Sequence, residues 1–482
     1  MTTIKLDPGA ALLLDALHGA GHAAYAVGGC VRDSLLGLDP HDWDLCTSAR
    51  PEQVMALFGE ETCIPTGLQH GTVTVKQGGR LYETTTFRTE GAYSDGRHPD
   101  AVCFVPDVRE DLARRDFTIN AMAYSAEEGL IDPFGGRDDL AAHLVRAVGE
   151  PERRFEEDAL RILRLYRFAA RFGFAIDPAT GAAARALGPH LDCVSAERIQ
   201  EELLKLLAAP RPGSYLESAV LAVVLPELEP EKQPERFAEL CRTIDRIEPT
   251  AENVPARLAA LLCPLGEAGA RKALRKLKCS NALTDEVTAL EREAGGGAGS
   301  FLLGHEFELR HPADALCLER HSHPAGRCPN SNSLFPPQAA VVAVAGHSIA
   351  RPIAFGNRVP PQRTVLRETT VTPDFTIYAR RLLGKYNLCT VQRIAALGTA
   401  LQPERAADFA ALSELAEQLD ADGVCCRVSQ LAVNGRDLMA AGVPAGPGIR
   451  KVLEALLDGV IREEYPNERQ ALLAAVQQLA AS

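Results

Sequence analysis

Residues 27–33 of the chain read Val-Gly-Gly-Cys-Val-Arg-Asp, and residues 42–44 read Asp-Trp-Asp. The first stretch ends an apolar run that is typical of a strand and leads into a pattern that is typical of a helix. At such a turn, Gly28 and Gly29 let backbone N–H groups approach a phosphate closely, and the following helix adds partial positive charge. A glycine pair after a strand is more often an ordinary turn, so the phosphate interpretation depends on its neighbours.

The second stretch predicts a cation site. Alternate residues of a strand point to the same face, so we expect Asp42 and Asp44 on one face and Trp43 on the other. Two carboxylates on one face repel each other, and Mg²⁺, which takes carboxylate and phosphate oxygens, removes that repulsion. We therefore expect Asp42 and Asp44 to bind Mg²⁺; the alternative is a pair of solvated surface acids. A third acid, Glu83, lies in the strand-like run Leu81–Phe87 and reaches the pair only if the sheet aligns it.

A glycine-rich turn followed by paired carboxylates favours phosphoryl transfer with two metal ions. One ion lowers the pKa of a hydroxyl nucleophile, and the other holds the triphosphate and its leaving pyrophosphate. The predicted chemistry is nucleotidyl transfer. A metal-dependent phosphohydrolase, which His41 beside Asp42 would suggest, needs further His and Asp ligands, and few histidines lie nearby.

Outward from this centre, the pattern predicts an α+β protein. Short β-like runs broken by Gly, Asp and Pro indicate a small mixed sheet with helices, with strands expected at Tyr25–Val27, Gly71–Lys76, Leu81–Phe87 and Ala101–Val105. After Arg137 the chain becomes helical, with amphipathic stretches at Phe155–Phe172, Ser195–Leu207, Arg257–Leu262 and Tyr378–Ala400. A turn-rich segment, Leu431–Gly448, precedes a helix expected at Ile449–Ile461. The glycine-rich residues 295–300 are typical of a linker, and we expect residues 305–367 to be poorly ordered.

Composition excludes several classes of protein. A chain of 482 residues is too long for a single domain, and 46% hydrophobic with 24% charged residues excludes wholesale disorder. We expect neither a membrane nor a secreted protein, because no long apolar run and no leader pattern occur. The 13 cysteines lack paired spacing, which favours reduced thiols in the cytoplasm. The net charge of −13 means that any polyanion must bind a local basic patch.

Five motifs then occur in order, and they resemble one family. They read GGCVRDSLLG (28–37), HDWDLCTSA (41–49), RRDFTINAMAY (114–124), DPFGG (132–136) and EDALRILRLYRFAARFGF (157–174). Together they resemble the class II tRNA nucleotidyltransferases, which comprise CCA-adding enzymes and bacterial poly(A) polymerases. Residues 431–461 resemble the tail of CCA-adding enzymes of the Bacillus type, which disfavours the poly(A) branch.

The resemblance implies a domain order and a reaction. The expected domains are a polymerase-β-like nucleotidyltransferase head (1–145), a neck with the nucleotide template (146–208), an α-helical body (209–300), an irregular insertion (301–372) and an α-helical tail that binds tRNA (373–482). The expected reaction adds C, C and A stepwise to the tRNA 3′ end from CTP and ATP. It releases pyrophosphate and uses no nucleic-acid template.

The resemblance also implies roles in the head. Gly28, Gly29 and Arg32 fall at the family's nucleotide-phosphate contacts, and Asp42 and Asp44 fall at its Mg²⁺ ligands. Glu83 matches its third acid, expected to assist the attacking 3′-hydroxyl directly or through the metal. Arg115, which follows Arg114, matches a residue that helps to hold the incoming nucleotide, as a fixed planar charge can. The alternative is that both arginines are ion-paired with Asp111 and Asp116.

The neck is expected to read the base. On one helix, Asp158 and Arg161 are three residues apart and therefore neighbours on its surface. A carboxylate and a guanidinium match the donor and acceptor edge of C or A, whereas G and U present the reverse polarity. In the family this pair is the protein template, and Arg164 and Arg167 match nucleotide contacts. With Arg171 they form a basic helix face, for which the alternative is a solvated surface.

Two further features concern the extent of the reaction and the RNA. The loop Phe87–Pro99 resembles the flexible loop that complete CCA-adding enzymes keep and CC-adding relatives have shortened, so it favours complete CCA addition. A CC-adding or A-adding enzyme, a poly(A) polymerase and a non-catalytic RNA-binding protein are the alternatives. The family pattern implies recognition of the acceptor and TΨC arms of tRNA by shape. Candidate basic contacts, or solvated helix faces, are Arg271, Lys272, Arg275, Lys276, Lys278, Arg380, Arg381 and Lys385. The sequence leaves a homodimer open.

Overall fold

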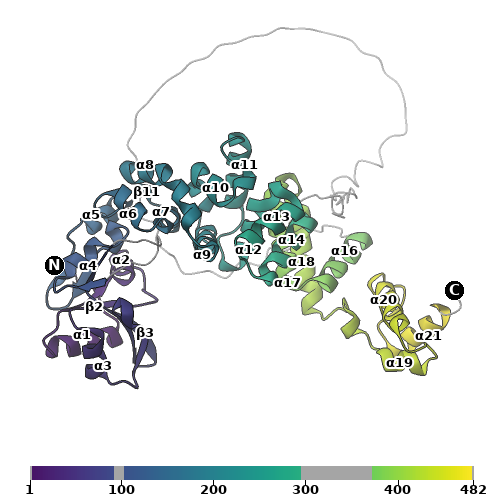
Figure 1. The fold of residues 1–482 in the computed structure, drawn as a ribbon. Coiled ribbons are helices and arrows are strands. Elements are labelled where there is room, and N and C mark those ends of the chain that lie inside the picture. The colour runs from purple at the N-terminus through teal and green to yellow at the C-terminus, as the bar shows by residue number, and fades with distance from the viewer. Residues whose placement is uncertain (1–2, 92–101, 295–371, 480–482) are drawn as a thin grey trace, which may run out of the picture.

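The computed structural model describes residues 3–91, 102–294 and 372–479. Its elements form an arch, with the mixed sheet at one end and the last helices at the other (Figure 1). No described helix has both the length and the apolar content needed to cross a bilayer. The predictions for residues 295–300 and 305–367, and for most of the loop at 87–99, lie outside the described residues.

Residues 3–145, which we call the head, contain the small mixed sheet that the sequence predicts. Its order is β3-β4-β5-β2-β1-β8-β9, and only β2 and β5 run parallel. The strands are β1 (Ala24–Val27), β2 (Leu45–Thr47), β3 (Cys63–Gly67), β4 (Thr72–Gln77), β5 (Arg80–Thr86), β8 (Ala123–Ser125) and β9 (Gly129–Ile131). A separate antiparallel ribbon pairs β6 (Arg88–Glu90) with β7 (Val102–Phe104), so the loop predicted from Phe87 begins as a strand.

Strand β1 is buried on both faces, which fixes the turn that follows it. Ala24 and Ala26 lie in the core that includes α1 (Pro8–Gly19) and α3 (Pro51–Phe58). Tyr25 and Val27 lie in a second core with α4 (Val108–Ala113). The alternation follows from the two-residue period of a strand. Helix α2 (Gly29–Leu35) begins directly after this strand, and α5 (Gly136–Ala141) ends the head.

Residues 146–208, which we call the neck, are helical and join the head through a short parallel pair, β10 (Leu144–Val145) with β11 (Ala175–Ile176). The helices are α6 (Pro151–Glu157), α7 (Leu160–Phe172), α8 (Pro178–Ala186) and α9 (Ala196–Leu207). The prediction of one helix over Phe155–Phe172 is wrong, because the chain is extended at Asp158, with φ −148° and ψ 102°. The Asp158 carboxylate accepts the Leu160 N–H at 3.1 Å, so the side chain caps a new helix instead of continuing the old one.

Within the described residues, eight helices form what we call the body, on a core that continues from the head and neck. They are α10 (Ser218–Val224), α11 (Pro234–Arg246), α12 (Val254–Leu262), α13 (Gly266–Lys276), α14 (Asn281–Ala294), α16 (Pro373–Lys385), α17 (Leu388–Leu401) and α18 (Ala406–Ala421). The helical pattern predicted over Tyr378–Ala400 is confirmed, and it comprises two helices, because Asn387 accepts the Thr390 N–H at 2.8 Å and starts α17. The helices α16, α17 and α18, which the sequence assigned to the tail, therefore share their core with the body.

The last three helices have a core of their own, around Leu438, Leu456 and Leu472. They are α19 (Gly435–Ala440), α20 (Pro447–Ile461) and α21 (Arg469–Leu479), at the far end of the arch in Figure 1. The helix predicted at Ile449–Ile461 is confirmed, while the short α19 lies inside the segment that the sequence marked as turn-rich.

Candidate active site

The sheet places Glu83 on the strand next to Asp44. Strand β2 pairs in parallel with β5, with Leu45 opposite Thr84. Asp44 and Glu83 each precede one of these paired residues, so they lie at the same level on neighbouring strands. Asp42 and Asp44 are exposed, whereas Trp43 between them is 5% exposed and packs in the core, as the predicted alternation requires. The prediction that these residues lie on a strand is wrong, because β2 begins only at Leu45.

The negative charge of this group is uncompensated. Among the described residues, neither the Asp42 nor the Asp44 carboxylate takes part in an ion pair or a side-chain hydrogen bond. Desolvation by the surrounding protein raises the pKa of Asp44 to about 6, and the charges of Glu83 and Asp42 raise it further against the opposing effect of Arg115. A carboxylate that is partly desolvated and close to other negative charges favours a cation beside it.

The donor set suits an ion with few protein ligands. Within the described ranges, no three His, Cys, Asp or Glu side chains converge closely enough to form a complete metal cage. Mg²⁺ keeps several waters and takes one or two carboxylates together with substrate phosphates. Two exposed carboxylates directly before the central strand β2 therefore fit Mg²⁺ and do not fit a closed structural metal centre.

Gly28 occupies a position that no other residue would fill well. Its φ is +77°, in the region that favours glycine, and it stands immediately before α2. A Cβ on Gly28 would lie 2.8 Å from Nη1 of Arg115. Arg115 therefore lies against the glycine turn, and its effect on the pKa of Asp44 shows that it is also close to the carboxylates.

Both arginines of the RRDF motif are held by one buried acid. Asp111 is fully buried and accepts from Arg114 Nη2 at 2.8 Å and from Arg115 Nη2 at 3.4 Å. Burial acts to raise the pKa of Asp111, but these two guanidinium groups hold it below its usual value. The ion-pair alternative for Arg114 and Arg115 is therefore correct for Asp111. It is wrong for Asp116, which pairs with Arg164 at 2.6 Å.

Arg32 lies inside the protein. It is 4% exposed, donates to Asp33 and Asn120, and stacks over the rings of Phe168 and Phe172 at 5.3 and 4.9 Å. It thus connects α2 of the head to α7 of the neck. In this conformation the guanidinium that was predicted to contact phosphate is bound by protein groups instead.

The predicted template residues lie close in sequence but have different partners. Arg161 is 9% exposed, and it pairs with Glu157 at 2.8 Å and donates to the Arg114 carbonyl at 3.1 Å. Asp158 pairs with Arg198 of α9 at 2.8 Å. The expectation that Asp158 and Arg161 are neighbours on one helix is wrong, because Asp158 lies in the break between α6 and α7.

The basic face of α7 is packed against protein. Arg167 is 9% exposed, pairs with Glu202 of α9 at 2.5 Å, and stacks over Phe168 at 4.0 Å. Arg164 pairs with Asp116 and lies 3.7 Å from Glu202. Burial acts to raise the pKa of Asp116, but Arg164 holds it far below its usual value. The solvated-face alternative is therefore wrong for Arg164 and Arg167.

The sequence analysis missed four partners that order this site: Asn120, Phe168, Arg198 and Glu202. Arg198 and Glu202 are four residues apart on a helix that the sequence does predict, and hence on one face of it. That spacing is the available signal. It does not reveal that the facing element lies 35 to 40 residues earlier in the chain.

Three families match segments of the chain. Residues 24–146 match the "Poly A polymerase head domain", residues 173–232 match the "Probable RNA and SrmB- binding site of polymerase A", and residues 368–476 match "tRNA nucleotidyltransferase domain 2 putative". These segments cover the head, the end of the neck with the start of the body, and the C-terminal region.

Similar proteins cover almost the whole length. The CCA-adding enzyme of Limosilactobacillus reuteri (strain DSM 20016) is 33% identical over 469 residues, which are 97% of this chain and 95% of the relative. That of Lactobacillus helveticus is 43% identical over 277 residues, 57% of this chain and 68% of the relative. The crystal structure of the Bacillus stearothermophilus CCA-adding enzyme in complex with CTP superposes with a TM-score of 0.70 and 29% identity, covering 99% of this chain and 98% of that one. The resemblance seen in the motifs is thereby confirmed, and the chain belongs to the CCA-adding enzymes, the tRNA nucleotidyltransferases that build the CCA end.

Proposed function

We propose that Asp42 and Asp44 bind Mg²⁺ and that the head uses this site to add C, C and A to tRNA from CTP and ATP. The observation that carries the proposal is the position of Asp44 and Glu83 at the same level on neighbouring strands, with Asp42 two residues earlier and no ion pair to either aspartate within the described residues. When bound, Mg²⁺ would neutralise the triphosphate and make the tRNA hydroxyl more acidic.

In the reaction, the 3′-oxygen of tRNA bonds to the α-phosphorus while the bond to pyrophosphate breaks, and the hydroxyl proton must leave. Glu83, which lies level with Asp44, would accept or orient that proton. Backbone N–H groups after Gly28 and the guanidinium of Arg115 offer donors to the phosphates.

Base selection is assigned to the neck. Asp158 offers an acceptor to the amino group of C or A, and Arg161 offers a donor to the ring nitrogen. Arg164 and Arg167, held on the same helix by Asp116 and Glu202, would contact the rest of the nucleotide. The pairing of these arginines supports the proposal, because side chains that are fixed before binding lose little entropy on contact.

For tRNA binding, the structure separates the basic candidates into two groups. Arg271, Lys278, Arg380, Arg381 and Lys385 are each paired with an acid. Lys272, Arg275 and Lys276 of α13 are exposed and make no ion pair within the described residues. We therefore assign the contact with the acceptor and TΨC arms chiefly to these three residues, since phosphate contacts need available positive charge.

The proposed location is the cytoplasm. All 11 cysteines among the described residues are free, and several of them, including Cys30 and Cys46, are buried. Buried thiols without disulfides fit a reducing compartment.

A gel assay tests the proposed reaction. Purified protein is incubated with tRNA that lacks its CCA end, with Mg²⁺, and with CTP alone or with CTP and ATP. We expect two added nucleotides with CTP alone and three with both. Two nucleotides in both reactions would instead assign a CC-adding enzyme, a long ladder a poly(A) polymerase, and no product an RNA-binding protein.

A further inference from the structure

Helices α19, α20 and α21, which we call the C-terminal unit, join the body at one narrow place. The adjacent residues Cys425 and Cys426 belong to different cores, Cys425 to that of the C-terminal unit and Cys426 to that of the body. The next residue, Arg427, donates to the carbonyls of Leu383 and Tyr386 at the end of α16, at 3.0 and 2.9 Å. Parts with separate cores move relative to each other unless a large apolar interface joins them. The chain therefore offers a pivot at this point.

The contact between α16 and α20 is polar and hollow. A cavity of about 240 Å³ lies between the two helices, so apolar packing does not fix the angle between them. Instead, Arg380 of α16 donates to the Ile461 carbonyl at 3.0 Å and pairs with Glu463 at 2.6 Å. The next residue, Arg381, pairs with Asp458 at 2.6 Å. We call these contacts the clasp, because they connect the C-terminal unit to the body beside the pivot.

Glu463 stands where the backbone favours glycine. Its φ is +61°, and its N–H donates to the Val460 carbonyl at 3.1 Å. The N–H of Glu464 donates to the Gly459 carbonyl at 2.9 Å, which completes the usual end of a helix with a left-handed residue. A side chain at this position strains the backbone. The carboxylate therefore does not serve the end of α20, and its one ion pair within the described residues is with Arg380, a side chain that is 13% exposed.

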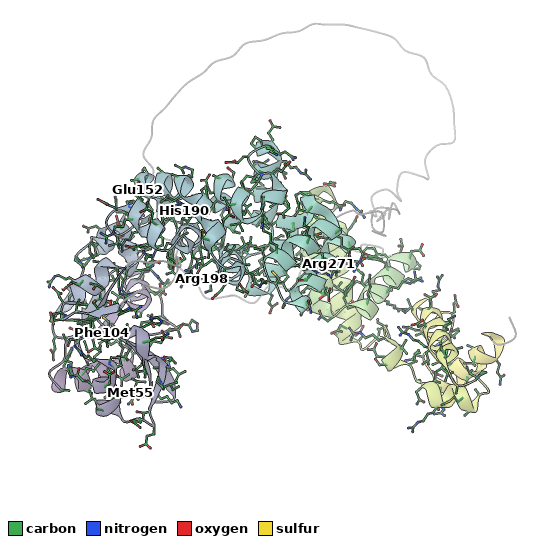
Figure 2. The ribbon with its side chains drawn as sticks, in the orientation of Figure 1. Met55, Phe104, Glu152, His190, Arg198 and Arg271 are labelled. Carbon is green, nitrogen blue, oxygen red and sulfur yellow. The ribbon has the colours of Figure 1, made fainter. Side chains whose placement is uncertain are left out.

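The clasp lies between two surfaces with available positive charge. Arg436 and Lys451 of the C-terminal unit are exposed and make no ion pair within the described residues, as phosphate contacts require. The other surface is on α13, which Arg271 marks in the middle of the arch in Figure 2, whereas the C-terminal unit lies at the far end. The angle at the clasp therefore sets how these two surfaces face one RNA.

We propose that Arg380 and Glu463 are positioning residues that hold the C-terminal unit at the angle in which it and α13 contact the same tRNA. The inference rests on the tRNA binding proposed above. Two linked contacts strengthen each other only when the geometry lets both engage at once. A unit that is held in advance loses little conformational entropy on binding, whereas a unit that pivots must be ordered by the RNA.

Loss of the clasp should therefore weaken tRNA binding and spare the chemical step. Asp42 and Asp44 lie in the head, so we expect a change in the KM for tRNA and not in kcat. The sign of the change is informative. The chain has a net charge of −13, and removal of an acid by itself strengthens the attraction to a polyanion. Weaker binding after loss of Glu463 thus requires a cause other than net charge.

The test compares Glu463→Gly with Glu464→Gln. The first removes the carboxylate of the clasp and relieves the backbone strain. The second removes the same charge from the next residue, which is exposed and has no ion pair within the described residues. Values of kcat and KM are measured for tRNA lacking its CCA end, with saturating CTP and ATP. For Glu463→Gly we expect a KM about fivefold higher, kcat within about twofold and little change in the unfolding temperature. Glu464→Gln should leave the KM equal or lower.

A double-mutant cycle with Arg380→Met separates positioning from direct contact with RNA. If Arg380 acts through Glu463, its replacement alone should raise the KM for tRNA about fivefold, and by less than about twofold in the Glu463→Gly background. If Arg380 instead contacts a phosphate, the two losses multiply.

An unchanged or lower KM for tRNA in Glu463→Gly would overturn the inference, as would an equal rise in Glu464→Gln or losses that multiply in the cycle. Should Glu463→Gly not fold, Glu463→Asn takes its place under the same criteria, because asparagine also tolerates this backbone conformation. Failure of the proposed function looks different: the unaltered protein would then add no nucleotide to tRNA, whatever the variants bind.

Discussion

The functional side chains of the head and of the neck differ in their ion pairing. Asp42 and Asp44 of the head make no ion pair within the described residues, and desolvation by neighbouring protein groups together with Glu83 raises the pKa of Asp44 to about 6. The arginines of the neck are paired with acids, as Arg167 is with Glu202. The carboxylates of the head are therefore available to a ligand, whereas the arginines of the neck are already neutralised by acids of the protein.

This difference has an energetic reason. A cation must displace its water to reach the carboxylates, and it does so only where they are open and lack a partner. A buried guanidinium without a partner would cost several kcal/mol, so the neck arginines need acids before any nucleotide arrives. The open carboxylates of the head can therefore bind and release a cation, whereas the paired arginines of the neck keep a fixed geometry.

Asp42→Ala should break the head and leave the fold intact. We expect incorporation to fall by at least about a thousandfold, because the proposed ion loses a ligand. The unfolding temperature without Mg²⁺ should be unchanged or slightly higher, because a repulsion near Asp44 is removed. Radiolabelled CTP incorporation and thermal unfolding measure the two effects, and tRNA binding serves as the control. Comparable incorporation in the variant would refute the metal assignment.

Glu202→Gln should lower the stability of the neck. The change leaves the buried Arg167 without a countercharge, so we expect a loss of about 3 kcal/mol in the free energy of unfolding. Urea unfolding measures it, with Glu201→Gln on the exposed face of the same helix as the matched control. If both variants lose the same small amount, the neck charges are not balanced as described.

Glu291 of α14 combines the two situations, since it is buried like the neck arginines and unpaired like the head acids. It is 5% exposed, and both carboxyl oxygens lack a hydrogen-bond partner among the described residues. Burial raises the pKa of Glu291 to about 8, with a smaller contribution from Glu267. The folded protein thus keeps a proton that the unfolded chain loses near its usual pKa of 4.5.

It follows that Glu291 lowers stability as the pH rises from about 5 to about 8, where the folded state binds more protons than the unfolded state. Glu291→Gln, which stays neutral, should remove about 2 kcal/mol of this pH dependence. Urea unfolding of both proteins at pH 5 and pH 8 gives the difference. Parallel pH profiles would show that the folded state does not hold this proton.

The smallest expected effect concerns tRNA. Replacing Lys272, Arg275 and Lys276 together by Gln should weaken tRNA binding about tenfold near 0.1 M salt and reduce its salt dependence. The control replaces Lys205, Lys232 and Arg242 by Gln, which removes the same charge from side chains that already pair with Glu. Filter binding at several salt concentrations separates the two sets. Equal losses of tRNA affinity in the two sets would mean that only net charge matters and that α13 does not contact tRNA.

The fold of the head and the order of the domains could be predicted from local sequence patterns. The alternation around Trp43 predicted that Asp42 and Asp44 are exposed and that Trp43 is buried, and the motifs identified the family, because both signals are local patterns of period two or of fixed spacing. Helices at Ser195–Leu207 and Ile449–Ile461 were likewise predictable from periodicity. Local patterns carry this information because backbone geometry repeats over a few residues.

The pairing of charged side chains could not be predicted, because it depends on how distant segments of the chain pack together. The register of β2 and β5 placed Glu83 beside Asp44, across about 40 residues of sequence. The break at Asp158 turned its carboxylate from Arg161 to Arg198, and packing buried the basic face of α7 that a helical projection leaves open to solvent. Such pairings follow from how separate elements pack, and no spacing along one element encodes them, because a charged side chain takes the partner that its buried surroundings offer.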